Sequence, residues 1–190
     1  MTMTTAELEV LHSHIDSSTK FLEFGAGAST VYAASVPGIQ QIDSVESSAE
    51  FVDTNLKPDP AISQALSAGK LLFHIIDIGK TFSWGYPASF CKKHRWPDYS
   101  FGIFRQRSEH DVVLIDGRFR VACTLNTILN TPAHCKILIH DFWNRPHYHV
   151  VLDFLETETE VDTLGVFNKR AQIDLHRVHA LIDKYKYFPR

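Results

Sequence analysis

Lys20-Phe21-Leu22-Glu23-Phe24-Gly25-Ala26-Gly27-Ala28-Ser29-Thr30 is the stretch that decides the predicted fold of this chain. Its apolar start predicts a buried strand, which breaks into two glycines before a helix that begins near Ala28. Glycines allow a sharp turn and let a ligand approach the main chain, and the first N–H groups of the helix lack partners within it. We therefore expect a nucleotide-like ligand here.

The residue types around the turn narrow the choice of ligand. A dinucleotide-binding turn has a third glycine, for close packing of the helix on the strand, where this chain has Thr30. Glu23 comes two residues before the first glycine, where a carboxylate that faced the ligand would repel a diphosphate. Such a carboxylate suits a ligand that carries an ammonium and a sulfonium. The alternative is an ordinary strand, turn and helix with a solvated Glu23.

Composition places the chain among ordinary globular proteins. Its 190 residues are 44% apolar and 22% charged, which fits one domain over residues 1–190. The net charge of −3 favours neither nucleic acid nor anionic membrane as a partner. The three cysteines lack metal-type spacing and are odd in number, which favours a reducing cytoplasmic setting. We also find no signal peptide and no apolar run of about 18 residues, so no membrane segment is expected.

The rest of the chain alternates between helical and strand patterns. Strands are expected at 20–24, 39–46, 71–77, 111–116 and 136–139, with an edge strand at 163–167. Helices are expected at 5–17, 28–35, 59–69, 121–129, 148–155 and 173–182. This order predicts a doubly wound, Rossmann-like α/β fold, with a mainly parallel sheet of about six or seven strands and helices on both faces.

The segment 79–107 interrupts this alternation. It holds eight of the 22 aromatic residues and six Lys or Arg against one Asp, so its charge is +5 and the remainder of the chain sums to −8. A long insertion of this kind is usually functional, and aromatic rings beside cations suit a planar or anionic guest. We take Trp84 as a candidate substrate contact and expect a short helix near 98–105. A lid over the sheet edge, or a contact in a homodimer, explains the segment equally well.

Five acidic residues follow the ends of predicted strands. They are Glu23, Glu46, Asp77, Asp116 and Asp141. In a doubly wound sheet, ligands bind beyond the carboxyl ends of the strands, at the point where the strand order reverses. Glu46 lies 21 residues after Gly25, which suits an acid that accepts hydrogen bonds from both ribose hydroxyls. Alternatively, Glu46 and the serines after it cap the next helix.

These motifs resemble those of a known family. The E-x-G-x-G pattern at 23–27 resembles the first motif of the class I S-adenosylmethionine-dependent methyltransferases. IDG at 115–117 and HD at 140–141 are similar to strand-end motifs of a small bacterial methyltransferase-like branch, which includes sugar O-methyltransferases of macrolide pathways. The resemblance extends over about residues 20–150.

The resemblance implies S-adenosylmethionine as the cofactor and assigns roles to individual residues. The cofactor-binding residues would be Glu23, Gly25, Gly27 and Ser29 at the methionine part, Glu46 at the ribose, Asp77 at the adenine, and Asp116. The catalytic residues, next to the transferring methyl group, would be Asp116, His140 and Asp141. Any of these three can accept the proton of a hydroxyl acceptor.

A metal is not expected, although metal-dependent relatives bind Mg²⁺ at the same two strand ends. Those relatives follow the strand-four motif with an acid and a histidine, where this chain has Arg118 and Phe119. A guanidinium opposes a divalent cation, and too few oxygen ligands remain for magnesium. Magnesium therefore stays a minor alternative. Zinc is not expected either, because His147 and His149 would point to different faces of a helix and could not bind it together with His140.

Three arginines are candidates for binding the substrate. Arg118, Arg120 and Arg145 can hold a carboxylate or phosphate by forked hydrogen bonds, unless they pair with Asp116 or Asp141 instead. The leading hypothesis is a methyltransferase acting on the oxygen or nitrogen of a small, anionic acceptor. One alternative is a non-catalytic protein of the same fold that binds S-adenosylmethionine or a related nucleoside. The other, an NAD-dependent oxidoreductase, is disfavoured by Thr30 and Glu23.

Overall fold

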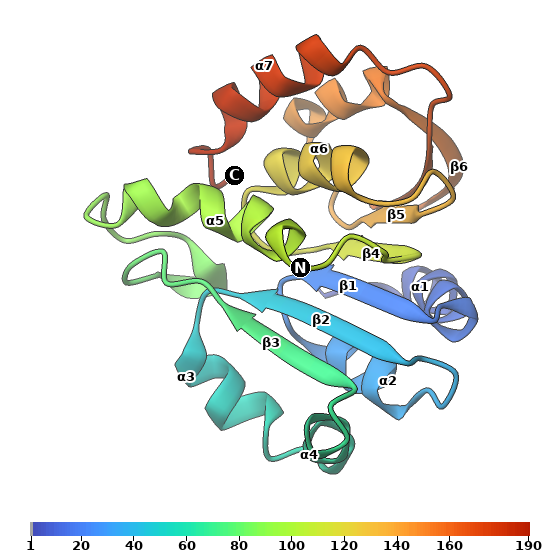
Figure 1. The fold of residues 1–190 in the computed structure, drawn as a ribbon, viewed down its shortest axis with the longest axis vertical. Coiled ribbons are helices and arrows are strands. Elements are labelled where there is room, and N and C mark those ends of the chain that lie inside the picture. Colours follow the sequence, from blue (N-terminus) through green and yellow to red (C-terminus); the bar gives the residue numbers. More distant parts are fainter. Residues whose placement is uncertain (1) are drawn as a thin grey trace.

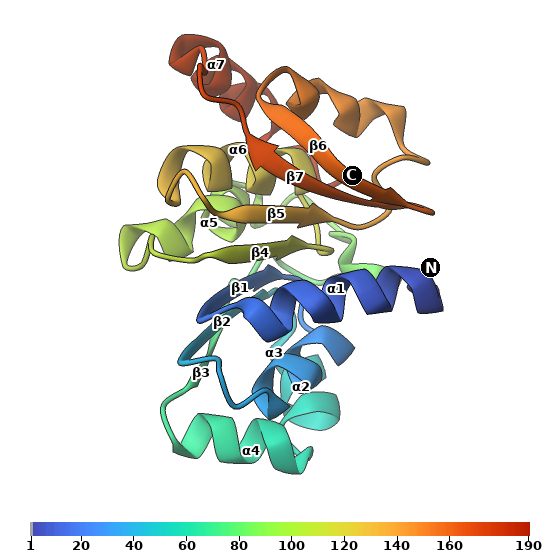
Figure 2. The same cartoon turned by 90° about the vertical axis from the view of Figure 1, so that its right-hand side faces the viewer.

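One seven-stranded sheet forms the centre of the computed structural model, which describes residues 2–190 (Figure 1). Its strand order is β3-β2-β1-β4-β5-β7-β6, and it runs from bottom to top in Figure 2. The strands are β1 (Lys20–Phe24), β2 (Gln41–Glu46), β3 (Leu71–Ile75), β4 (Val112–Ile115), β5 (Lys136–Ile139), β6 (Leu155–Val161) and β7 (Leu164–Lys169). The first five are parallel and β7 is antiparallel to both neighbours. The predicted doubly wound α/β fold is confirmed.

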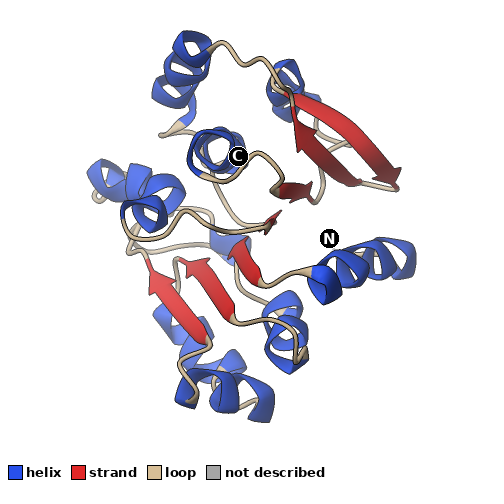
Figure 3. Ribbon diagram, turned by 45° about the vertical axis from the view of Figure 1, so that its right-hand side comes forward, coloured by secondary structure: helices blue, strands red, loops and turns tan. Residues whose placement is uncertain are grey.

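Helices cover both faces of this sheet (Figure 3). They are α1 (Thr5–Ser17), α2 (Ala28–Ser35), α3 (Ala49–Phe51, continued as a π-helix to Leu56), α4 (Pro60–Ser67), α5 (Trp96–Phe101), α6 (Arg120–Asn130) and α7 (Leu175–Tyr185). One core contains Leu11, Ala33 and Ile62 from α1, α2 and α4, and the other contains Trp96, Leu125 and Val178 from α5, α6 and α7. No helix in the described residues is both long and apolar enough to cross a membrane.

The strand order reverses between β1 and β4, which both continue from buried strands into glycine turns. β1 pairs with β2 on one side and with β4 on the other, both in parallel. Chains that leave β1 and β4 therefore diverge to opposite faces, and the crevice between them is where doubly wound folds bind ligands. The stretch 20–30 forms the predicted strand, turn and helix.

Two predictions for the C-terminal part were wrong. The segment 148–155 is not an α-helix: Pro146–Asp153 is a 3₁₀ helix, and Leu155 already belongs to β6. The strand predicted at 163–167 is β7, which lies between β5 and β6 rather than at the edge. The edge strand β6 was missed because its sequence, LETETEV, lacks an apolar face. Charged side chains are typical of edge strands because they discourage further pairing.

The aromatic and basic segment 79–107 divides into two parts. Its second part contains α5 and a 3₁₀ turn, Gly102–Arg105, in the region where the sequence predicts a short helix. There Trp96, Tyr99 and Ile103 are buried in the core. The first part contains two short 3₁₀ turns, Ser83–Gly85 and Lys93–Arg95, and a bridge between Thr81 and Pro87, and its Phe82 side chain is 68% exposed. The second part therefore belongs to the core, whereas the first part exposes large aromatic side chains to solvent.

Candidate functional site

A cavity of about 780 Å³ lies at the carboxyl ends of the strands, around the switch point. This volume is in the usual range for small-molecule sites. From the glycine turn and β2 it is lined by Gly25, Ala26, Gly27, Ala28, Ser29, Glu46, Ser47, Ser48 and Phe51. From β4, β5 and the segment after it come Asp116, Gly117, Arg118, Arg120, Asp141 and Arg145. The remaining walls are Thr2, Met3, Leu8 and Leu11 around α1, and Thr81, Phe82, Trp84, Gly85, Tyr86 and Tyr99 from 79–107.

The glycine turn presents bare backbone to this cavity. Gly25 has φ +98°, and a Cβ at this position would lie 2.7 Å from the Cα of Gly117. The turns after β1 and β4 are thus in backbone contact, and a side chain at Gly25 would force them apart. At Gly27 a Cβ would meet nothing within 4 Å, so the wall is open there. The turn is not filled by the protein's own side chains, and a ligand can reach its backbone.

Glu23 lies beneath the turn and does not line the cavity. Its side chain is fully buried and accepts hydrogen bonds from the hydroxyls of Ser29 (2.6 Å), Thr30 and Ser44 (2.7 Å). Thr30 also accepts a hydrogen bond from the Gly27 N–H, 2.9 Å away. Burial raises the pKa of Glu23 to about 7, against the opposing effect of the three hydroxyls. Glu23 therefore supports the turn and the start of α2 from below.

Glu46 lines the cavity at the end of β2 and also holds the backbone around it. One carboxylate oxygen accepts a hydrogen bond from the Ala26 N–H (3.2 Å) in the glycine turn. The other accepts from the N–H groups of Ser47 (2.5 Å) and Ser48 (2.9 Å), before α3. The capping alternative thus holds, and because the residue still faces the cavity, a ribose role is compatible with it.

Arg120 joins the two strand-end acids on the opposite side of the cavity. Its guanidinium nitrogens lie 3.0 Å from Asp116 Oδ1 and 3.5 Å from Asp141 Oδ2. Its side chain is buried and also donates to the backbone carbonyls of Gly117, Asp116 and His140. Arg145 adds a second ion pair to Asp141, at 2.7 Å. The alternative of structural ion pairs thus holds for Arg120 and Arg145.

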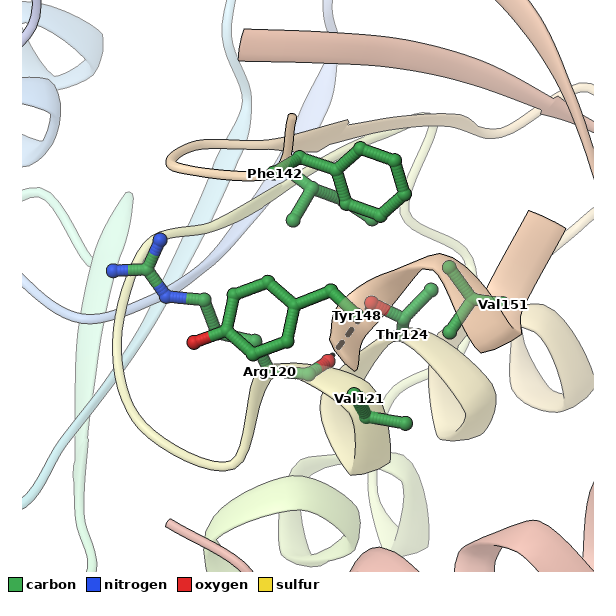
Figure 4. A pocket seen from close by; sticks show the side chains of 7 residues that line it. Arg120, Val121, Thr124, Phe142, Tyr148 and Val151 are labelled. Carbon is green, nitrogen blue, oxygen red and sulfur yellow. Dashed lines mark hydrogen bonds between the residues drawn. The ribbon is translucent and has the colours of Figure 1, made fainter. Parts of the chain in front are cut away.

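Aromatic packing behind the network keeps Arg120 in place. In Figure 4 the ring of Tyr148 lies between Phe142 and the first turn of α6, and Arg120 extends past it. The guanidinium carbon lies 5.9 Å from the centre of this ring, and the Thr124 hydroxyl donates to the Arg120 carbonyl at 2.8 Å. Almost no free space remains among these residues. Arg120 is thus oriented before any ligand arrives.

His140 lies behind Asp116 and is outside the cavity wall. Its Nδ1 is 2.9 Å from Asp116 Oδ1, and its Nε2 is 3.6 Å from Glu7 Oε2 in α1. Burial tends to raise the pKa of Asp141, but Arg120, His140 and Arg145 together lower it below its usual value. Asp141 also has the left-handed φ of +52°, a conformation that is often retained at functional sites. Asp116 and Asp141 therefore face the cavity, whereas His140 does not line it and bonds to Asp116 from behind.

These residues do not fit a divalent metal ion. Asp116, His140 and Asp141 offer donor atoms within 4.8 Å of one another. The guanidinium of Arg120, however, already lies against both carboxylates, and a dication there would meet a fixed positive charge. The arginine that opposes a metal ion is therefore Arg120, and not Arg118 as predicted from the sequence. His149 bonds to the Phe142 carbonyl and His147 packs on Tyr148, so neither joins His140 at a common site.

The remaining predicted residues fall on both sides of the cavity wall. Asp77 does not line the cavity; it pairs with Lys92 and accepts a hydrogen bond from the Gly79 N–H, at 3.0 Å. Trp84 lines the cavity but is 76% exposed. Arg118 lines it as a buried side chain, with its guanidinium carbon 4.3 Å from the centre of the Tyr86 ring. The sequence therefore located the arginine, but not the aromatic ring that covers it.

Residues around α1 also line the cavity, which was not predicted from the sequence. Met3, which precedes α1, and Leu8 within it line the cavity, whereas the sequence predicted only the helix at 5–17. Glu7 anchors the helix start through a capping box with Thr4 and accepts hydrogen bonds from the N–H (2.8 Å) and hydroxyl (2.6 Å) of Thr163. The only signal in the sequence was the capping box, which predicts where the helix begins but not what it covers.

Comparison with solved structures shows where this fold occurs. A methyltransferase-like protein from Silicibacter pomeroyi is 30% identical, with a TM-score of 0.85 over 100% of this chain and 97% of that one. An RNA methyltransferase from Salinibacter ruber, in complex with S-adenosyl-L-homocysteine, is 14% identical, with a TM-score of 0.53 over 92% of this chain and 97% of that one. MycE methyltransferase of the mycinamycin biosynthetic pathway, in complex with Mg, S-adenosylhomocysteine and mycinamycin VI, is 10% identical, with a TM-score of 0.52 over 93% of this chain and 51% of that one.

No protein-family model and no curated protein matches the sequence. The two more distant structures share the class I methyltransferase fold with this chain. The Silicibacter pomeroyi protein is similar in both sequence and fold, along nearly the full length of both chains. By that similarity, the chain belongs to the family of this methyltransferase-like protein.

Proposed function

We propose that the protein is an S-adenosylmethionine-dependent methyltransferase that acts on a small acceptor. The observation that carries the proposal is the bare backbone of Gly25–Gly27, open to a cavity of about 780 Å³ at the switch point of the sheet. Membership of a methyltransferase-like family and the complexes of the distant relatives with S-adenosylhomocysteine support the same cofactor type.

The residues around the glycine turn would hold the cofactor. Gly25, Gly27 and Ser29 present backbone and hydroxyl groups to the methionine part, and Glu46 accepts hydrogen bonds from the ribose. Glu23 acts indirectly, because its carboxylate orients the Ser29 and Thr30 hydroxyls rather than reaching the cavity. Asp77 would need to part from Lys92 to contact the adenine, so we assign the adenine to the cavity wall around Ser47 and Phe51 instead.

The other side of the cavity would hold the acceptor. S-adenosylmethionine supplies an electrophilic methyl group, which leaves its sulfonium as a bond forms to the acceptor oxygen or nitrogen. Asp116 faces the cavity and would take the proton that the acceptor loses, with His140 behind it as the next group in a relay. Arg120 and Arg145 hold the two carboxylates in position, and the N-terminal helix with the Thr81–Tyr86 segment would exclude water.

A protein that binds the same cofactor without turnover is the second candidate. The observation that favours it is the pairing of Asp116 and Asp141 with Arg120, because the guanidinium occupies the carboxylate oxygens that would accept the proton. An NAD-dependent oxidoreductase is disfavoured by the missing third glycine at Thr30 and by the absence of a phosphate-binding pattern in the turn.

Calorimetric titration tests the cofactor, and an acceptor screen tests turnover. We expect micromolar affinity for S-adenosylhomocysteine and no measurable binding of NAD. The reverse result would remove the proposal. A screen with radiolabelled S-adenosylmethionine should then find an acceptor whose methylation persists in excess EDTA, since Arg120 takes the place of a metal. Tight binding without transfer to any acceptor would favour the second candidate.

A further inference from the structure

Arg118 is a buried cation without an anionic partner among the residues that the structure describes. Its side chain is 7% exposed, and its Nε and Nη1 atoms are buried with no hydrogen-bond acceptor in the part of the chain that the structure describes. It also forms no ion pair there, whereas Arg120 and Arg145, which line the same cavity, are both paired with acids. An unpaired buried charge is costly, so such a group is usually retained for a ligand.

The surroundings of Arg118 orient it as part of a binding site. Its guanidinium carbon lies 4.3 Å from the centre of the Tyr86 ring, an arrangement that favours a cation but supplies no acceptor for Nε and Nη1. Gly85 covers the side chain closely: a Cβ there would lie 3.6 Å from Arg118 Cγ and 3.6 Å from Ser47 Oγ. The arginine is thus fixed under the 79–107 segment, within the cavity wall.

We propose that Arg118 binds an anionic oxygen group, a carboxylate or a phosphate, on a small molecule held in the cavity. A guanidinium edge forms two parallel hydrogen bonds to either group, and a desolvated site strengthens them. The inference rests on the proposed function for its choice of ligands, of which two can supply the anion. One is the methionine carboxylate of the cofactor, and the other is an acid group on the acceptor.

The test compares the wild type with Arg118→Met, which keeps the length of the side chain and removes its charge. Arg170→Met, a change of an exposed arginine outside the cavity, is the matched control. Three probes are used: S-adenosylhomocysteine; 5′-methylthioadenosine, which keeps the nucleoside but lacks the amino-acid part; and inorganic phosphate at constant ionic strength. Calorimetry gives the first two affinities and thermal unfolding gives the effect of phosphate.

If the cofactor carboxylate is the partner, Arg118→Met weakens the binding of S-adenosylhomocysteine at least tenfold and leaves the affinity for 5′-methylthioadenosine unchanged. If the acceptor supplies the anion, both affinities stay unchanged, and phosphate raises the Tm of the wild type but not that of Arg118→Met. The inference is overturned if the variant matches the wild type with all three probes.

Two further readouts distinguish this inference from a purely structural role of Arg118 and from a failure of the proposed function. Without ligand, Arg118→Met should have a Tm equal to or above that of the wild type, because it removes an unpaired buried charge; a clear loss would indicate a structural role and overturn the inference. If the wild type binds neither nucleoside, the proposed function fails. In that case, a phosphate effect that disappears in Arg118→Met would still support the anion site. If phosphate does not raise the Tm of the wild type, the anion site is overturned as well.

Discussion

The two sides of the cavity floor are built in different ways. At the ends of β1 and β2 the wall is bare backbone, with an open position at Gly27 and a single acid, Glu46, bonded to N–H groups. At the ends of β4 and β5 the wall is a closed network in which Arg120 joins Asp116 and Asp141. The geometry of the first side is set by the main chain, so the proposed nucleoside would enter it without rearrangement.

The second side depends on charges that neutralise one another. The guanidinium of Arg120 stabilises the negative charges of Asp116 and Asp141. A substrate can therefore bond to these carboxylates only to the extent that Arg120 releases them. If the two sides hold a cofactor and an acceptor as proposed, we expect shape to govern recognition of the cofactor and charge to govern recognition of the acceptor. Four measurements test the contrast, beginning with the largest expected effect.

Removing Arg120 should be the most destabilising change. Arg120→Met leaves half-buried Asp116 without its cation and Asp141 with Arg145 alone. It also removes the donor to three backbone carbonyls, which together should lower the free energy of unfolding by about 3 to 5 kcal/mol. Urea denaturation measures this. The control is Arg105→Met, which breaks a more exposed pair with Asp98 and should cost less than about 1 kcal/mol. Equal stabilities for the two variants would contradict the view that the second side is a closed network.

A side chain at Gly25 should damage the backbone-built side. Gly25→Ala places a Cβ 2.7 Å from Gly117 at φ +98°, so we expect a loss of about 3 kcal/mol of stability and of nucleoside binding. Gly38→Ala, where a Cβ meets nothing within 4 Å, should change stability by less than about 1 kcal/mol. Chemical denaturation measures the stability. If Gly25→Ala proves as stable as the wild type, the two turns are not in tight backbone contact.

The buried carboxyl of Glu23 should make stability depend on pH. Its pKa is raised from 4.5 to about 7 in the folded protein, so the native state binds more protons than the unfolded state between these values. Stability is therefore fully present below about pH 4.5 and falls as the pH rises through about 7, by up to about 3 kcal/mol.

Urea denaturation from pH 5 to pH 8 measures this slope, and Glu23→Gln should flatten it because the amide does not titrate. The matched control is Glu50→Gln, an exposed carboxyl that should leave the slope unchanged. A variant Glu23→Gln that keeps the wild-type slope would show that another group is responsible.

The smallest effect is expected for Glu46, whose carboxylate already accepts hydrogen bonds from backbone N–H groups. Glu46→Ala should weaken the binding of S-adenosylhomocysteine at least tenfold, or by about 1.4 kcal/mol, because it removes the ribose acceptor and the hydrogen bond from Ala26. Glu50→Ala, on the exposed start of α3, serves as the comparison in calorimetry. Unchanged affinity in Glu46→Ala would remove its ribose role.

Most of the fold followed from local patterns in the sequence. The β1 to α2 stretch, the capped helices α1 and α4, and the strand ends at Glu46, Asp116 and Asp141 formed where periodicity and capping residues indicated. The failures lie where a segment takes its structure from its neighbours. β6 has no apolar face and is a strand because β7 pairs with it, and Pro146–Asp153 shows that aromatic and apolar spacing alone does not make an α-helix.

The candidate site was predicted in its positions but less well in its contacts. The sequence placed acids at the strand ends and arginines beside them. Arg120, however, pairs with two of those acids, and Arg118 has no ion-pair partner within the described residues. Glu23 was expected to face a ligand and instead lies under the turn, bonded to three hydroxyls. Such choices depend on side-chain packing that residue spacing does not report.

By itself the sequence determined the parallel sheet, the open glycine turn and the edge at which the charged residues gather, because hydrophobic periodicity and glycine conformations act over a few neighbouring residues. Only the tertiary structure decided which charges neutralise each other and which segments close the cavity. Those outcomes rest on contacts between distant parts of the chain, such as Glu7 with Thr163 and Arg118 with Tyr86. Burial and pairing are properties of the assembled core, and they set the energy of every charge in the site.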